Sequence, residues 1–93
     1  MPSRDDLIAV LREARELLSR PGNDFSWSSW NDAAHATGEL DELMLAIGRG
    51  ELPRLQLEVV FAPTGPMQEA SLSSGWAQEF LDLAKRFDAA LGA

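Results

Sequence analysis

Apolar side chains recur every three or four positions over residues 5–19, the spacing that gathers side chains on one face of a helix. Ser3 stands where a helix cap would, and Arg20-Pro21-Gly22 ends the pattern, because the residue before a proline avoids helical dihedral angles. We therefore predict a helix over 5–19. Its apolar stripe, which other elements must cover, consists of Leu7, Val10, Leu11, Ala14, Leu17 and Leu18.

Two further segments repeat this periodicity and predict helices with one buried face. The first covers residues 30–47, with Ser29 as its expected cap. Its stripe comprises Trp30, Ala33, Ala36 or Thr37, Leu40, Leu43 or Met44, and Ile47. The second covers residues 76–91, and its stripe comprises Trp76, Phe80, Leu83, Ala84, Phe87 and Leu91.

Residues 55–62 alternate apolar and polar side chains at their start and end apolar on both faces, which predicts a β-strand. Pro63-Thr64-Gly65-Pro66 predicts a tight turn, and residues 67–72 predict a second strand that returns along the first. The expected fold is one α+β domain over 1–93 in the order α-α-β-β-α, with a small antiparallel hairpin packed on three helices. Because a two-stranded sheet leaves both edges open, we expect hairpins to pair across a homodimer.

Charge limits the classes of partner. The net charge of the 93 residues is −7, and residues 24–82 hold ten acids against only Arg49 and Arg54. Phosphate contacts are supplied mostly by Lys and Arg, so this balance opposes nucleic acid and anionic lipid. A partner attracted by charge would be basic.

The chain offers little for metal, redox or membrane chemistry. It has no cysteine, which excludes disulfides and thiolate metal ligands. No apolar run approaches the roughly 18 residues that span a bilayer, and the N-terminus lacks the apolar segment of a signal peptide. We therefore expect a cytoplasmic protein without cofactor.

Residues 23–32 mix large aromatic side chains with Ser, Asn and Asp, as a loop held by aromatic anchors would. Trp30 belongs to the stripe of the second helix, whereas Trp27 lies off that stripe and is a candidate contact for a ligand or partner. Three polar turns, each next to an aromatic residue, are expected to meet at one end of the fold, either as a site or as caps and turns that hold short loops. The candidate contact residues are Asn23, Asp24, Trp27, Thr64, Gln68, Glu69 and Trp76.

His35 has carboxylates on its own helical face. Asp32, His35 and Glu39 have the spacing of a His–carboxylate metal site, but a solvated helix face has the same pattern. The sequence has no nucleophile elbow, phosphate loop or dinucleotide fingerprint. We therefore expect no catalytic residues and no bound metal.

These features favour a non-enzymatic protein-interaction module, inhibitor-like, immunity-like or regulatory, that binds a basic partner. The acidic face expected to meet that partner consists of Glu39, Asp41, Glu42 and Glu58. The alternative is a small-molecule- or metal-binding domain with a pocket at the loop end. Trp27 and Trp76 would then be the walls of the pocket.

Overall fold

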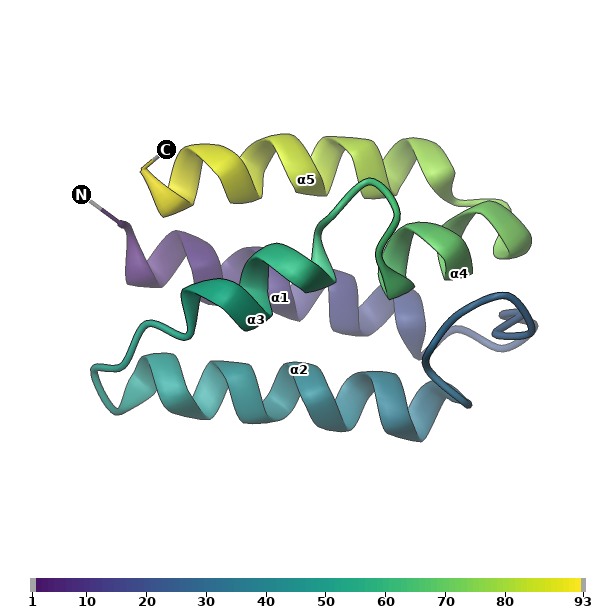
Figure 1. Ribbon diagram of the computed structural model, residues 1–93, viewed down its shortest axis with the longest axis horizontal. Coiled ribbons are helices and arrows are strands. Elements are labelled where there is room, and N and C mark those ends of the chain that lie inside the picture. The colour runs from purple at the N-terminus through teal and green to yellow at the C-terminus, as the bar shows by residue number, and fades with distance from the viewer. Residues whose placement is uncertain (1, 93) are drawn as a thin grey trace.

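The computed structural model describes residues 2–92, which form five helices and contain no strand (Figure 1). The helices are α1 (Arg4–Leu18), α2 (Ala33–Gly48), α3 (Arg54–Val60), α4 (Pro66–Ser74) and α5 (Ala77–Leu91). None of them has both the length and the apolar character needed to cross a membrane. The α+β class expected above is therefore wrong: the described chain is all-helical.

Helix α1 is the centre of the fold because it packs against both α2 and α5. Figure 1 shows α5, α1 and α2 along the long axis of the molecule, with the two short helices α3 and α4 in front of them. The backbone N–H of Ser3 donates to the carbonyl of Ala90 at 2.7 Å, so the start of α1 lies beside the end of α5.

The predicted first helix is confirmed, with its bounds shifted by one residue. Ser3 caps α1 by accepting a hydrogen bond from the Asp6 backbone N–H at 3.3 Å. All six residues of the predicted stripe are buried, and they form one cluster with the apolar faces of α2 and α5. Burial of this stripe, rather than helix propensity, is what stabilises a helix of this length.

The second helix starts three residues later than expected. Asp32, not Ser29, is the cap, because its carboxylate accepts from the backbone N–H of His35 at 2.8 Å. Trp30 is buried as predicted, but it lies before the helix, and its indole N–H donates to the carboxylate of Glu39. Trp76 likewise is buried and precedes α5, which begins at Ala77.

The predicted first strand is wrong: residues 54–60 form α3. Alternation would place Leu55, Leu57 and Val59 on one face of a strand. Instead Leu57 is completely buried, whereas Leu55 and Val59 are 72% and 53% exposed. The buried positions 57, 60 and 61 have helical spacing, and a run this short does not distinguish the two periods.

The predicted return strand is also wrong, because residues 66–74 form α4. Pro66 occupies the first turn, where a missing N–H costs nothing, and Gly75 ends the helix in the left-handed conformation (φ 86°). Met67, Ala70 and Ser71 are buried at helical spacing. Without a hairpin in residues 2–92, the predicted pairing of hairpins across a homodimer has no structural basis.

Candidate functional site

Residues 19–32 connect α1 to α2 and will be called the Trp27 loop, the dark blue segment beside α4 in Figure 1. Asn23 joins this loop to two helices. Its side-chain amide donates to the carbonyl of Leu17 at 2.8 Å, and its Oδ1 accepts from the indole N–H of Trp76 at 2.9 Å. Asn23 and Trp76, two candidate contact residues, thus bind each other and link the end of α1 to the start of α5.

The Trp27 loop is fastened to both ends of α4. The backbone N–H of Asp24 donates to Ser74 Oγ at 2.8 Å, at the last residue of the helix. The hydroxyl of Ser28 donates to the carbonyl of Pro66 at 2.9 Å, at the first residue. These two bonds restrain the chain on both sides of Trp27.

The loop is also braced internally at Asp24. The pKa of Asp24 lies below its ordinary value of 3.8 because Ser26 donates hydrogen bonds to its carboxylate. The side-chain hydrogen bond has the larger effect and the backbone hydrogen bond the smaller. The bond from the Ser26 backbone N–H to Asp24 Oδ1 is 2.8 Å long. Asp24 therefore serves as an ionised turn residue within the loop.

Trp27 projects from this restrained loop into solvent. It is 76% exposed, whereas Trp30 and Trp76 are 1% and 3% exposed. An exposed tryptophan on an ordered loop leaves a large apolar surface for a partner to cover, and tryptophan is the residue type most enriched at binding hot spots.

The remaining candidate contact residues lie at the other end of α4. Thr64 is exposed in the connection before that helix, and Gln68 and Glu69 are partly buried near its start. Asn23 and Asp24, by contrast, bond to Ser74 and Trp76 at its end. The Trp27 loop therefore runs along α4: Asn23 and Asp24 lie at the end of that helix, and Ser28, next to Trp27, bonds at its start, near Gln68 and Glu69.

The four predicted acidic residues do not form one face. Glu39 and Glu42 both line two adjoining hollows on α2, and no Lys or Arg lines either hollow. Asp41 instead faces α1, where it accepts from Arg15 Nε at 2.7 Å and from Nη2 at 3.2 Å, which raises the pKa of Arg15. Glu58 lies on α3, 3.9 Å from Arg54.

The three metal-site candidates each have another bonding partner. Asp32 caps α2, His35 Nδ1 accepts from the Asn31 backbone N–H at 3.1 Å, and Glu39 accepts from the Trp30 indole. Over residues 2–92 no group of three or more His, Cys, Asp or Glu residues is arranged to hold a metal ion.

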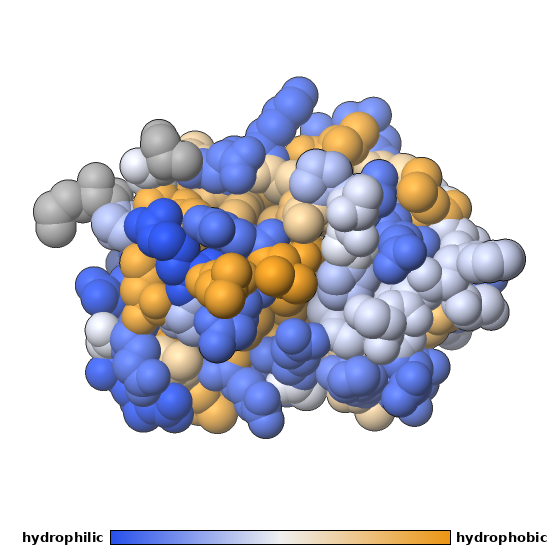
Figure 2. All heavy atoms as spheres, viewed as in Figure 1, coloured by the Kyte–Doolittle hydropathy of each residue, from blue (hydrophilic) through white to orange (hydrophobic). Residues whose placement is uncertain are grey.

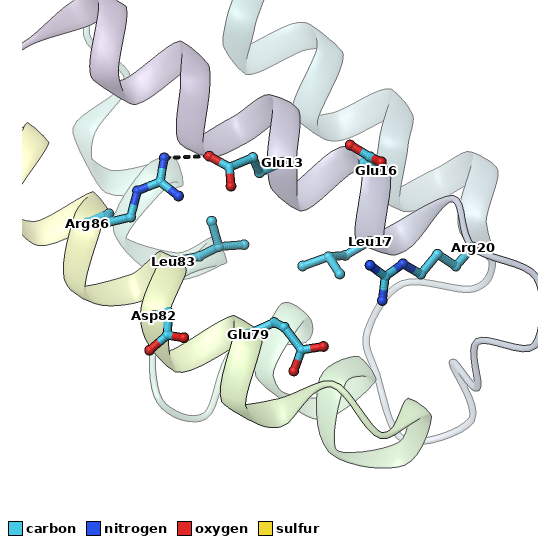
Figure 3. Close-up of a pocket in the computed structure, with 8 residues that line it drawn as sticks. All are labelled: Glu13, Glu16, Leu17, Arg20, Glu79, Asp82, Leu83 and Arg86. Atoms are coloured by element: carbon cyan, nitrogen blue, oxygen red, sulfur yellow. Dashed lines mark hydrogen bonds and ion pairs between the residues drawn. The ribbon is translucent and has the colours of Figure 1, made fainter.

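A groove between α1 and α5 was not foreseen from the sequence. It encloses about 330 Å³ and is lined by Glu13, Glu16, Leu17, Arg20, Glu79, Asp82, Leu83 and Arg86. Figure 3 shows Leu17 and Leu83 facing each other across it, with Arg86 bonded to Glu13 at one end. Its two walls stand more than 50 positions apart in the sequence, and six of its eight residues have the charged side chains of a solvated helix face, so no sequence pattern predicts the groove. Charges of both signs line it, which favours no one class of ligand.

Known proteins give no further guide to these surfaces. Comparison with models of protein families, with curated proteins and with solved structures found no match. A functional proposal for this chain therefore rests on its own geometry and charge.

Proposed function

We propose that this chain is a non-enzymatic protein-interaction module and that Trp27 is its central contact with a basic partner. The observation that carries the proposal is the 76% exposure of Trp27 on a loop fastened to both ends of α4. A tryptophan offers roughly 150–250 Å² for burial. Because the loop is already ordered, binding loses little conformational entropy there.

The charge of the surface supports a basic partner. The chain carries a net charge of −7, and Glu39 and Glu42 stand in hollows that no Lys or Arg lines. An indole face also attracts the guanidinium of Arg or the ammonium of Lys. Such a surface suits an inhibitory, immunity-like or regulatory role, in which binding is itself the activity.

Affinity capture with three immobilised proteins tests the proposal: the wild type, Trp27→Ala and Leu45→Ala. Leu45 is the matched control, because it is 64% exposed but lies on α2. We expect the wild type and Leu45→Ala to retain the same basic protein from a lysate of the source cells, and Trp27→Ala to lose it. Removal of a central hot-spot residue costs about 2 kcal/mol or more, roughly a thirtyfold loss of affinity.

The fold and the salt response serve as controls. Trp27→Ala should keep the melting temperature of the wild type, because the loop bonds come from residues 24 and 28. Retention by the wild type should fall as salt rises, since screening weakens attraction between exposed charges. Equal retention by Trp27→Ala and the wild type would refute the proposal.

A further inference from the structure

A second surface, which we call the α3–α5 groove, lies between the end of α3 and the outer face of α5. It encloses about 350 Å³, and seven of its ten lining residues are apolar. The lining residues are Glu58, Phe61, Ala62, Pro63, Gln68, Phe80, Leu81, Ala84, Phe87 and Asp88. In Figure 2 hydrophobic spheres lie over α3, and hydrophobic surface continues from there toward α5.

The walls of the groove are fixed by packing. The rings of Phe61 and Phe87 stack with centroids 4.3 Å apart and planes 10° from parallel. The connection to α4 passes so close to α3 that a Cβ on Gly65 would lie 2.4 Å from the carbonyl oxygen of Val59. The groove is therefore preformed, and a ligand would not have to order it.

One exposed apolar side chain lines this groove, and two more lie on α3 outside its lining. Leu81 lines it and is 49% exposed. Leu55 and Val59, 72% and 53% exposed, stand one turn apart on α3, the helix that also contributes Glu58. Exposed apolar residues gathered around a concave apolar surface mark an interaction site more strongly than scattered ones.

The charges of the groove indicate what kind of partner fits. Among residues 2–92, Glu58 and Asp88 are the only charged residues that line it, and Arg54, 3.9 Å from Glu58, lies outside the lining. A second copy of this chain would bring carboxylates against carboxylates, which is unfavourable. An apolar segment flanked by Lys or Arg would complement both the apolar lining and the carboxylates of Glu58 and Asp88.

The shape of such a segment follows from how peptides bind. Residues 2–92 contain no strand, so they offer no sheet edge to a partner's strand. A groove that lies between two helices and is lined mostly by apolar side chains suits a helix whose anchors recur at i, i+3, i+4 and i+7. We infer that the α3–α5 groove binds an amphipathic helix of a partner protein, with Lys or Arg beside its apolar face. The inference rests on the proposed function only for the basic character of the partner.

Titration of a synthetic peptide into the full chain, followed by backbone amide NMR shifts, tests this inference. The probe is a helical peptide of about 14 residues, roughly 21 Å long, with Leu at the anchor positions and Lys elsewhere. We expect it to shift resonances of the groove residues. A scrambled peptide of the same composition and a version with Glu in place of Lys should leave those resonances unchanged.

Variants of the chain locate the binding. Leu81→Lys should weaken binding of the Lys peptide at least about tenfold, because it removes an apolar contact and adds a like charge. The isosteric double variant Glu58→Gln/Asp88→Asn, which keeps side-chain size, should weaken it by roughly fivefold at low salt. Leu45→Lys, on α2, adds the same charge away from the groove and should bind like the wild type.

Three results would overturn the inference: no shift of groove residues, equal binding by Leu81→Lys and the wild type, or groove shifts that depend on protein concentration without peptide. The last would assign the groove to a second copy of this chain. The Trp27 proposal is tested independently of the groove, by affinity capture with the Trp27→Ala variant. If the peptide binds in the groove and Trp27→Ala captures the partner as well as the wild type does, the groove inference holds and the Trp27 proposal is refuted.

Discussion

At the scale of single residues, Asn23 shows how one polar side chain can hold a functional loop. It donates to Leu17 and accepts from Trp76, so three segments meet at one amide. Trp76 is 3% exposed, which leaves its indole N–H little access to water. The role of Asn23 is therefore to hold the Trp27 loop in place. Its amide has little hydrogen-bonding capacity left for a ligand.

Asn23→Ala should destabilise the fold by about 1–3 kcal/mol, because a buried donor that loses its partner keeps its desolvation cost. Urea unfolding at neutral pH measures this. Asn23→Asp keeps the acceptor for Trp76 but turns a carboxylate oxygen toward the carbonyl oxygen of Leu17, so it should also be less stable than the wild type. Stability equal to the wild type in Asn23→Ala would show that the two bonds do not hold the loop.

Replacing two glycines with alanine should change the stability of the fold in opposite directions. A Cβ at Gly65 would lie 2.4 Å from the Val59 carbonyl oxygen and 3.2 Å from that of Ala62, whereas Gly38, inside α2, has open space. Gly65→Ala should destabilise by about 1–3 kcal/mol through overpacking. Gly38→Ala should stabilise by up to about 1 kcal/mol, since alanine is the better helix former. Thermal unfolding of both variants checks the opposite signs.

At the scale of elements, the sequence predicted the long helices and missed the short ones. The stripes of α1, α2 and α5 repeat over 15 or 16 residues, long enough to distinguish helical spacing from alternation. Helix α3 has only seven residues, and its first six positions alternate polar and apolar side chains. For α4 the signals were present, because Pro66 and Gly75 mark its two ends, but they also suit a turn.

The candidate site was predictable only where it depends on neighbouring residues in the sequence. Local chemistry pointed to Asn23, Asp24 and Trp27 as residues of an anchored loop. It could not show that the loop bonds to Ser74 and Trp76, because those partners stand about 50 positions away. The α3–α5 groove depends on how α3 packs, so the wrong strand prediction hid it.

Helices α1 and α5 are joined by an ion pair that should respond to pH. The pKa of Glu13 lies below its ordinary value of 4.5, mainly because its carboxylate accepts a hydrogen bond from Arg86. Burial has the next largest effect and raises the pKa, and the positive charge of Arg86 lowers it. A lowered pKa in the folded state adds stability above the unfolded pKa, and that stability is lost as pH falls through the folded pKa. The pair is half exposed, so it contributes at most about 1 kcal/mol.

Glu13→Gln should therefore be less stable than the wild type at pH 7 and match it once the pH lies well below 4.5. Urea unfolding at several pH values measures the difference. Glu16→Gln is the matched control: Glu16 lines the same groove, and among residues 2–92 it forms no ion pair. A Glu13→Gln deficit that persists unchanged in acid would contradict the pKa direction.

At the scale of the whole molecule, the two proposed binding surfaces share one helix. The Trp27 loop is fastened to α4 through Ser74 and Pro66, and Gln68 of the same helix lines the α3–α5 groove. The net charge of −7 gives both surfaces the same preference for a basic partner. The chain is therefore an acidic helical domain that exposes aromatic and apolar side chains such as Trp27 and Leu81.

Photo-cross-linking from position 27 tests whether Trp27 contacts a basic partner. A benzophenone amino acid replaces Trp27 in one protein and Leu45 in a second, and each is irradiated in its source cells. We expect a covalent adduct with a basic protein from position 27 and none from position 45. No adduct from position 27, or the same adducts from both positions, would contradict the claim that Trp27 is the contact residue.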